Sequence, residues 1–456
     1  MVDMMGQTTM YQHGYGNYNN IYGYNAQDFG AIYGYNSTAS PASEVGLLGT
    51  KFREAVSKSK DYKMKVETEA NVGYSTGFLA FDFLNGQVIH VMAPDRQYKY
   101  YSVGIVDGSM NMLIGRSGCG KTSFAMQIGT NICGMYRTST MFHDDIEGGM
   151  TEARKAILSG WTQEQLQYKY ICRNTGITAE NFYERIKLIS DLKLNDRASY
   201  LYDTGLYDSF GQKIFKLEPT VYLLDSLSLM MPETYTEEDE ISGQMSTTAT
   251  ARMNASVFRR VVPLLKSANI ILLVINHINQ KVEINMFKKT RLQVGFLKEG
   301  ETLPGGNMPI YLSNNIIRFD DSNIKEKDGL GIDGYLVDLT LVKSRQNKAG
   351  KSVTLVFNQS TGYDPDLSLL LLLKENKLIN GAGAYLYIGD RADYKFSQKE
   401  FKKKLMTDDE FKKIVIAASI PILQQLVYDV QQEPLLGHSG VSQSILEQMN
   451  QLDMAA

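Results

Sequence analysis

A loop able to hold the phosphates of a nucleotide lies between Gly115 and Thr122. Its sequence, GRSGCGKT, fits G-x-x-x-x-G-K-T and stands between the apolar run 112–114 and a helix-like stretch, 123–132. The glycines let backbone N–H groups close around phosphate oxygens, Lys121 reaches the β and γ oxygens, and Thr122 offers its hydroxyl to Mg²⁺. The residues expected to contact the nucleotide are Gly115, Ser117, Gly118, Cys119, Gly120, Lys121, Thr122 and Ser123. Cys119 is interpreted as a small filler, with a redox role as the alternative.

A second carboxylate is needed to hold the water shell of the metal, and Asp225 is the candidate. It ends the apolar run 221–224, which is typical of a buried strand. We therefore expect Thr122 and Asp225 to hold Mg²⁺ together. The alternative is that Asp225 only caps the segment that follows it.

Two more polar sites follow apolar runs. The run 141–143 leads into Asp144-Asp145-Ile146-Glu147, and Glu147 is the candidate for orienting or deprotonating the attacking water. Because three acids fall within four residues, the register stays open, and a solvated acidic turn is the alternative. The run 270–275 ends in Asn276-His277, where His277 could sense the γ-phosphate; a packed or solvent-facing histidine is the alternative.

These residues must be positioned by the elements around them, which alternate between apolar runs and amphipathic helical stretches. Such alternation is typical of an α/β domain with a mainly parallel sheet, whose ligands bind at the carboxyl ends of the strands. The candidate residues should therefore meet at one edge of the sheet. The predicted strands are 110–115, 139–144, 220–225, 269–276, 315–319, 335–343 and 352–357.

Four segments are predicted along the chain. Residues 1–44 are rich in Tyr, Asn and Gly and form a disordered tail, which is either self-associating or an inert extension. Residues 45–69 form a helix and linker, and residues 70–365 form the α/β core. Residues 366–456 form a small, α-rich region with a frayed end. Its clearest helix start is Thr407-Asp408-Asp409-Glu410, which fits a capping box beginning at Thr407.

Composition excludes several classes of protein. An apolar fraction of 43% and a charged fraction of 21% argue against wholesale disorder and against a membrane-embedded chain. The net charge of −3 means that contact with nucleic acid has to come from local basic loops. Three cysteines without metal-ligand spacing imply neither a disulfide framework nor a zinc site. A reducing, cytoplasmic compartment is expected, without a secretion signal or membrane span.

The order of motifs resembles that of the RecA/RadA superfamily of recombination ATPases, most closely the UvsX-type recombinases of large tailed phages. The resemblance covers about 70–370 and implies a RecA-like P-loop ATPase core. The matching motifs are Tyr74-Ser75-Thr76-Gly77 with Asp82, the phosphate loop, Asp145-Ile146-Glu147, Leu224-Asp225-Ser226, Val274-Ile275-Asn276-His277, Pro304-Gly305-Gly306-Asn307 and Lys343-Ser344-Arg345.

The resemblance implies roles for individual residues. Glu147 takes the place of the catalytic glutamate, beside Lys121, and His277 that of the γ-phosphate sensor. Lys343 and Arg345 match a cationic pair that reaches the ATP site of the neighbouring subunit, where cations stabilise charge on the transferring phosphoryl group. A solvated basic strand end is the alternative for this pair. Arg154 stands where family members often stack an aromatic ring on adenine, and it is therefore expected to contact the nucleotide. The helix in 45–69 has the position of a self-association helix.

DNA-binding loops are expected after Asp225 and after His277. The first loop ends near Arg252, and Arg259 shares its helical face; an ordinary exposed arginine stripe is the alternative. The second loop, about 278–307, interleaves cations with aromatic residues, which suits single-stranded DNA. Its glycines would bring backbone amides close to a phosphate. The DNA-binding candidates of the second loop are Lys281, Phe287, Lys288, Lys289, Arg291, Gly305, Gly306 and Asn307.

The resemblance therefore implies an ATP- and Mg²⁺-dependent recombination protein. Such a protein forms filaments on single-stranded DNA, pairs that strand with duplex DNA and exchanges strands. ATP would lie between identical subunits, in a helical filament or a ring. Two alternatives stay open: a hexameric replicative DNA helicase of the DnaB type, and a nucleotide-controlled assembly scaffold driven by the N-terminal tail.

Overall fold

The computed structural model describes residues 71–208, 211–233, 247–280, 292–322, 333–382 and 385–429. The expectations for the tail 1–44, for the segment 45–69 and for the end of the C-terminal region lie outside these ranges. Within them the chain has a mixed α/β fold, and none of its helices is long and apolar enough to cross a membrane.

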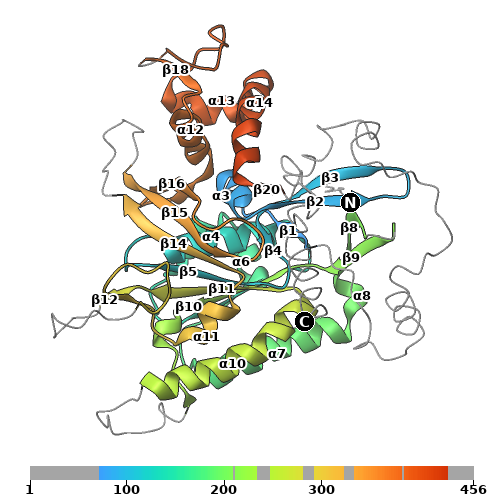
Figure 1. Cartoon of the computed structure of the whole chain (residues 1–456), viewed down its shortest axis with the longest axis vertical. Helices are drawn as coiled ribbons and strands as arrows, with labels where there is room; N and C mark the ends of the chain where they lie inside the picture. The colour runs from blue at the N-terminus through green and yellow to red at the C-terminus, as the bar shows by residue number, and fades with distance from the viewer. Residues whose placement is uncertain are drawn as a thin grey trace, which may run out of the picture.

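A nine-stranded sheet forms the centre of the molecule (Figure 1). Its strands are β5 (Met110–Gly115), β6 (Met141–Asp145), β7 (Tyr170–Arg173), β10 (Thr220–Asp225), β11 (Ile270–His277), β14 (Asn315–Ser322), β15 (Gly334–Ser344), β16 (Ser352–Asn358) and β17 (Gly362–Asp364). They lie in the order β17-β16-β15-β14-β5-β11-β10-β6-β7. From β14 to β7 all neighbours are parallel, whereas β15, β16 and β17 add antiparallel pairs. The expected mainly parallel sheet is confirmed.

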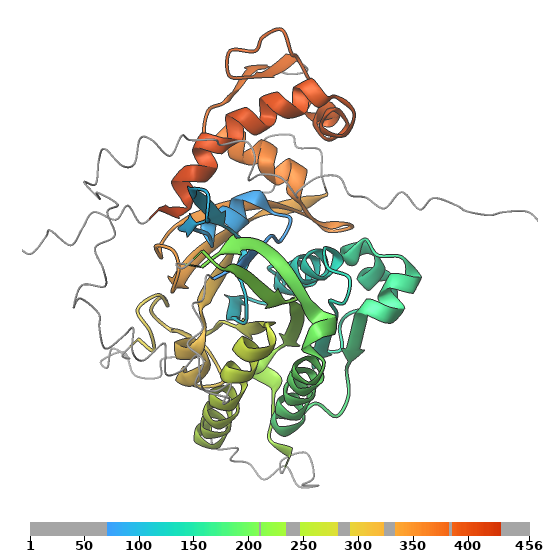
Figure 2. The same cartoon turned by 90° about the vertical axis from the view of Figure 1, so that its right-hand side faces the viewer.

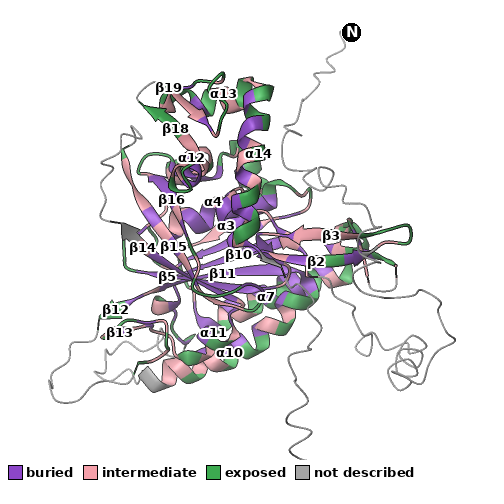
Figure 3. Ribbon diagram, turned by 45° about the horizontal axis from the view of Figure 1, so that its top comes forward, coloured by how far each residue is buried: buried purple, intermediate pink, exposed green. Residues whose placement is uncertain are grey.

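The central strands are continuous apolar runs because both faces of the sheet are covered. Every residue of β5 and β10 is buried, as is β11 up to its last residue (Figure 3). All seven predicted strands belong to this sheet. The sequence did not predict β7 and β17, which are four and three residues long and too short to show a hydrophobic period.

Helices cover the two faces of the sheet (Figure 2). The helices of the core are α3 (Leu79–Leu84), α4 (Lys121–Gly134), α5 (Glu152–Ser159), α6 (Gln163–Lys169), α7 (Ala179–Asn195), α8 (Arg197–Tyr200), α10 (Thr247–Ala268) and α11 (Asn307–Leu312). Helices α3 and α4 share one hydrophobic cluster with Leu113 and Leu223, and α7 and α10 share another with Met112 and Leu224. Successive strand residues thus face opposite helix layers.

Short two- and three-stranded sheets surround this core. They are built from β1 (Gly73–Tyr74), β2 (Gln87–Met92), β3 (Gln97–Ser102), β4 (Ile105–Val106), β8 (Leu201–Tyr207), β9 (Lys213–Leu217), β12 (Asn279–Gln280) and β13 (Glu301–Thr302). Strand β2 pairs antiparallel with β3, β8 with β9, and β12 with β13.

The C-terminal region lies beside the antiparallel end of the sheet (Figure 1). Its elements are α12 (Pro365–Glu375), β18 (Ile379–Ala382), β19 (Tyr385–Ile388), α13 (Phe401–Thr407), α14 (Asp409–Leu426) and β20 (Tyr428–Asp429). Leu370 of α12 and Phe411 of α14 belong to the same hydrophobic cluster as α4. Strand β20 returns to the core and pairs with β2.

The predicted capping box at Thr407 is wrong, because the helix starts one residue later. Asp408 is the N-cap of α14, and its Oδ1 accepts a hydrogen bond from the N–H of Phe411 at 3.0 Å. Thr407 is the last residue of α13, and its hydroxyl donates to the carbonyl of Lys403 at 2.9 Å. A residue in helical conformation whose hydroxyl is engaged one turn back cannot cap the next helix.

This assignment predicts different effects at two adjacent positions. Asp408→Ala is expected to remove the cap, at a cost of roughly 1 kcal/mol, which corresponds to about fivefold faster amide exchange in the first turn of α14. Hydrogen exchange of peptides that cover 408–415 measures the effect, with Thr407→Ala as the control. An equal effect of both substitutions would contradict the assignment.

Candidate active site and nucleic-acid interface

The predicted phosphate loop, residues 115–122, runs from the last residue of β5 into the first turn of α4 at the carboxyl edge of the sheet, and residues 116–120 join the two elements. Gly118 and Gly120 have φ angles of +80° and +83°, in the left-handed region that favours glycine. A Cβ atom on Gly118 would meet nothing within 4 Å, and Arg116, Ser117 and Gly118 are exposed. The loop therefore presents its backbone to solvent in front of the first turn of a 14-residue helix. This arrangement suits an anion.

Lys121 and Cys119 hold the loop from inside. The Lys121 ammonium is buried and donates to the carbonyls of Gly115 and Arg116 at 3.1 and 2.6 Å. Cys119 is also buried, and its Sγ donates to Arg116 O at 3.0 Å. The expectation that Cys119 is a small filler agrees with this packing.

Asp225 ends β10 and is joined to the start of α4. The Thr122 hydroxyl donates to Asp225 Oδ2 at 2.6 Å, so the two expected metal ligands lie together. Oδ1 of Asp225 is buried and has no hydrogen-bond partner within the described part of the chain. Burial, assisted by the negative charges of Glu147 and Asp145, raises the pKa of Asp225 to about 7, although the bond from Thr122 lowers it.

An unsatisfied carboxylate oxygen beside a hydroxyl fits Mg²⁺, which takes oxygen ligands and keeps several of them from water and phosphate. In the described ranges, no cluster of three or more His, Cys, Asp or Glu side chains could hold a metal by itself. A magnesium ion held only by Thr122, Asp225 and the oxygens of a nucleotide is compatible with both observations.

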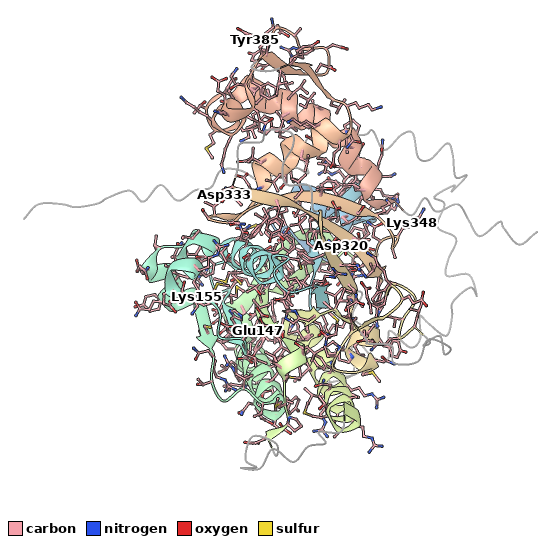
Figure 4. The ribbon with its side chains drawn as sticks, turned by 90° about the vertical axis from the view of Figure 1, so that its left-hand side faces the viewer. Glu147, Lys155, Asp320, Asp333, Lys348 and Tyr385 are labelled. Carbon is pink, nitrogen blue, oxygen red and sulfur yellow. The ribbon has the colours of Figure 1, made fainter. Side chains whose placement is uncertain are left out.

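Glu147, which is labelled in Figure 4, contacts His277 at the same edge of the sheet. His277 Nε2 lies 2.7 Å from Glu147 Oε1. His277 is level with Gly115 on the adjacent strand, so this pair lies close to the start of the phosphate loop. Burial raises the pKa of Glu147, but hydrogen bonds from His277 and Ser226 outweigh it, and the pKa lies below its usual value. Glu147 is therefore ionised at neutral pH.

The three acids at the end of β6 and just beyond it have three different environments. Asp144 forms an ion pair with Arg185 at 2.6 Å and accepts a hydrogen bond from the Tyr222 hydroxyl. Asp145 accepts bonds from the backbone N–H groups of a turn, at Gly148 and Met150. Glu147 alone of the three contacts His277. The structure thus distinguishes the surroundings of the three acids, whose register the sequence left open. The catalytic role of Glu147 stays a prediction.

Arg154 lies in the first turn of α5 and reaches the loop between β16 and β17. Its Nη1 donates to the carbonyls of Gln359 and Ser360 at 2.9 and 2.7 Å, and Nη2 lies 3.4 Å from the hydroxyl of Ser123. The guanidinium therefore lies near the nucleotide candidate Ser123, and its predicted nucleotide contact stays a prediction.

Two tyrosines that the sequence did not point to contact the phosphate loop. The Tyr335 hydroxyl donates to Gly118 O at 2.8 Å, and the Tyr363 hydroxyl donates to Cys119 O at 3.3 Å. Both come from strands more than 200 residues further along the chain. No local sequence pattern predicts these contacts, because the two tyrosines come near the loop only when the antiparallel strands β15 and β17 have joined the sheet.

Lys343 and Arg345 lie at the edge of the sheet opposite the phosphate loop. Strand β15 is antiparallel to β14, and Lys343 pairs with Ile316, which is level with Met112 near the beginning of β5. Asp333, just before β15, and Lys348, four residues after its end, lie at the two ends of this strand in Figure 4. The cationic pair is thus separated from the predicted phosphate loop of the same chain by the length of β5.

The C-terminal end of α11 holds both cations. The Lys343 ammonium donates to the carbonyls of Ile310, Tyr311 and Ser313 at 2.7, 2.8 and 2.8 Å, and Arg345 donates to Tyr311 O at 2.9 Å. All three donors of the ammonium are engaged. Burial, and then the charge of Arg345, lower the pKa of Lys343 to about 8. For Lys343, the alternative of a solvated strand end does not fit these contacts.

The two predicted DNA-binding segments meet at the start of α11. Arg252 and Arg259 are exposed on α10, two turns apart. Gly305 and Gly306 have φ angles of +90° and +84°, and a Cβ on Gly306 would lie 2.9 Å from the Cβ of Ala251, next to Arg252. The Gly-Gly pair therefore packs on the helix that carries the two arginines.

The remaining DNA-binding candidates fall into two groups. Asn307 is exposed, and its Oδ1 accepts a bond from Gln293 at 2.9 Å. Five candidates lie outside the described residues: Lys281, Phe287, Lys288, Lys289 and Arg291. Their roles stay predictions.

Comparison with known proteins gives one informative similarity. No family model matches the chain. Among curated proteins, the "Recombination and repair protein" of Enterobacteria phage T4 is 29% identical over 153 residues, which are 34% of this chain and 35% of that protein. The chain thus spans about a third of the length of the curated relative that it matches.

The buried carboxyl of Asp225 makes a prediction for the free protein. With its pKa raised to about 7, Asp225 is protonated in the folded chain at pH values at which it is ionised in the unfolded chain. Its contribution to the free energy of unfolding is complete below about pH 4 and is lost as the pH rises to about 7, roughly 4 kcal/mol in total.

Asp225→Asn is expected to lack this pH-dependent component. Urea unfolding of both proteins between about pH 4.5 and 8 in the presence of a chelator measures it. The wild type should lose stability relative to the variant as the pH rises. Parallel curves would show that Asp225 is already ionised in the free fold.

Proposed function

We propose that this chain is a DNA-dependent ATPase that forms filaments on single-stranded DNA and catalyses homologous pairing and strand exchange. One observation carries the proposal. His277, which contacts Glu147 at the phosphate edge, is followed at once by Ile278, whose N–H donates to Gly115 O at 3.1 Å, and then by the second predicted DNA-binding loop. The end of β11 thus belongs to the candidate triphosphate site, and the segment that follows β11 directly belongs to the candidate DNA site.

The residues at this edge can serve phosphoryl transfer, which depends on positioning and on charge stabilisation. The backbone of residues 116–120, with Lys121 and Ser123, holds the phosphates, and Thr122 and Asp225 hold Mg²⁺. A bound Mg²⁺ neutralises charge on the phosphate oxygens. Glu147 is ionised and exposed enough to accept a proton from an attacking water. Cys119 and Gly120 complete this loop, and their backbone N–H groups would contribute to binding the phosphates.

His277 has two candidate partners, which makes it suited to sense the γ-phosphate. Its Nε2 contacts Glu147 in the free protein, and a phosphate oxygen at the same edge competes for that nitrogen. A change of partner at His277 acts directly on Ile278 and on the loop that follows. The segment from His277 to Ile278 therefore couples ATP binding to DNA binding. The strength of this coupling is the free energy by which occupation of one site changes the affinity of the other.

The placement of Lys343 and Arg345 supports a head-to-tail assembly. The pair lies at the opposite edge of the sheet from the phosphate loop, so it serves the site of a neighbouring subunit rather than its own. Repetition of one such contact gives a ring or an open helix. The pair then stabilises negative charge on the transferring phosphoryl group, as arginine fingers do.

The similarity to a phage protein named for recombination and repair supports a role of this chain in those processes and a partner that is DNA. A DnaB-type hexameric helicase and a nucleotide-controlled scaffold stay as alternatives. Both share a nucleotide site, but only the recombinase pairs homologous strands.

Turnover of ATP with and without single-stranded DNA is the first test. DNA is expected to stimulate the wild type, and Lys121→Ala is expected to lower turnover by roughly a hundredfold or more, because it removes a phosphate-binding cation. Lys399→Ala, which changes an exposed lysine of the C-terminal region, is the matched control and should behave as the wild type.

The same preparations separate the alternatives. Joint molecules formed from single-stranded DNA and homologous duplex support the recombinase. Closed rings that unwind a forked duplex without forming joint molecules would support the helicase instead. ATP turnover that does not change when DNA is added would contradict both the recombinase and the helicase.

A mixing experiment tests the shared site. One subunit type carries Lys121→Ala, and the other carries Lys343→Ala with Arg345→Ala, so that neither is active alone. In a random one-to-one mixture about a quarter of the interfaces combine an intact phosphate loop with an intact cationic pair, and about a quarter of the wild-type turnover should return. If the mixture stays inactive, or if the Lys343/Arg345 variant is active alone, the pair does not act in a neighbouring site.

A further inference from the structure

Glu301 and Arg318 form a buried, two-armed ion pair beside the candidate nucleotide site. Nη1 and Nη2 of Arg318 donate to the two carboxylate oxygens of Glu301 at 2.7 and 2.8 Å. The side chain of Arg318 is only 7% exposed and that of Glu301 only 2%. Arg318 Nε donates to Asp320 at 2.8 Å. The bonds from Arg318 lower the pKa of Glu301, so the pair is ionised at neutral pH.

The pair joins the central sheet to the stem of the second loop. Arg318 belongs to β14 and is level with Ile114, one residue before the phosphate loop begins. Glu301 belongs to β13, which pairs with β12 through two residue pairs only. This short ladder closes the segment 281–300, which carries the basic candidates Lys281, Lys288, Lys289 and Arg291.

A stem of two residue pairs is too short to keep its place by itself. Its first strand, β12, is held because it continues from β11 and because Ile278 N–H donates to Gly115 O. Its second strand, β13, is held by the Glu301–Arg318 pair. The side-chain amide of Gln293 adds hydrogen bonds to the N–H and carbonyl of Leu303 at 2.8 and 3.1 Å. Both strands of the stem are therefore attached at the level at which the phosphate loop begins.

The chemistry of the pair indicates what it supplies. A buried ion pair adds little net stability, because the loss of hydration offsets the attraction between the charges. Its two parallel hydrogen bonds instead fix the distance and the orientation of the carboxylate. An apolar contact of similar size would stabilise the stem without fixing its direction.

We propose that Glu301 and Arg318 are positioning residues that fix the second DNA-binding loop relative to the phosphate loop, so that each site responds to the occupation of the other. The inference rests on the proposed function for what the loop binds. Neither residue contacts DNA or nucleotide in this scheme; both act through β12 and β13.

Three variants separate a positioning role from a purely structural one. Glu301→Gln removes one of the two acidic partners of Arg318 and leaves Asp320, whereas Arg318→Met leaves the buried carboxylate of Glu301 without its arginine. The double variant Glu301→Leu/Arg318→Met replaces the pair by apolar side chains, a change that is often neutral for stability and that keeps the test open if the single variants fold poorly. Asp393→Asn, which breaks an exposed ion pair with Arg391, is the control.

Three quantities are measured for each full-length protein: the thermal midpoint, the KM for ATP without DNA, and the concentration of single-stranded DNA that gives half-maximal stimulation. The positioning role predicts that the double variant regains the thermal midpoint and a KM within about twofold of the wild type, while its half-maximal DNA concentration stays about tenfold higher or more. Glu301→Gln shows the same selective loss, and Asp393→Asn shows none.

Two results would overturn the inference. A double variant with the DNA response of the wild type would show that any well-packed contact suffices, and a folded Glu301→Gln with an unchanged DNA response would show that the pair is dispensable. If the wild type is not stimulated by DNA, the proposed function fails, and hydrogen exchange of residues 293–307 then decides the inference. Equal protection in the wild type and Glu301→Gln would overturn it.

Discussion

The hydrogen bond between Thr122 and Asp225 joins the start of α4 to the end of β10 and depends on the register of the whole parallel sheet. Asp225 lies on the same face of β10 as Leu223, which packs in the cluster that includes α4. A slip of one residue would turn Asp225 toward α7 and α10 and bring Leu224 to Thr122. The strand interiors, which are continuously apolar and tightly buried, therefore decide whether the polar residues at the edge meet.

The same constraint places the candidate nucleic-acid elements. Since β11 lies between β5 and β10, His277 lies between the predicted phosphate loop and Asp225. The chain that follows His277 therefore starts at the edge of the sheet that carries the candidate nucleotide site. The returning segment packs Gly305 and Gly306 on α10 and ends in α11, whose last carbonyls hold Lys343. One stretch of about 35 residues thus links both edges of the sheet.

Local patterns in the sequence predicted most of this edge, because its residues follow continuous apolar strands. The predicted phosphate loop is one continuous stretch of sequence. Asp225 and His277 each end a strand that its apolar run identifies. The sequence favoured Glu147 but left the register among Asp144, Asp145 and Glu147 open. Their different environments depend on Arg185, about 40 residues away, and on His277. The sequence also could not reveal Tyr335, Tyr363 or the Glu301–Arg318 pair. These contacts join segments that only the completed sheet brings together.

The three carbonyl oxygens around the Lys343 ammonium have a consequence for how subunits associate. A lysine whose three N–H donors are all satisfied within its own chain can bind a phosphate in a neighbouring chain only if it gives up some of those hydrogen bonds. Its contribution to an interface is therefore the difference between two similar sets of hydrogen bonds, and that difference is small. In the proposed head-to-tail assembly, a small difference of this kind would favour polymers that grow and shorten readily, with the balance set by the concentration of nucleotide.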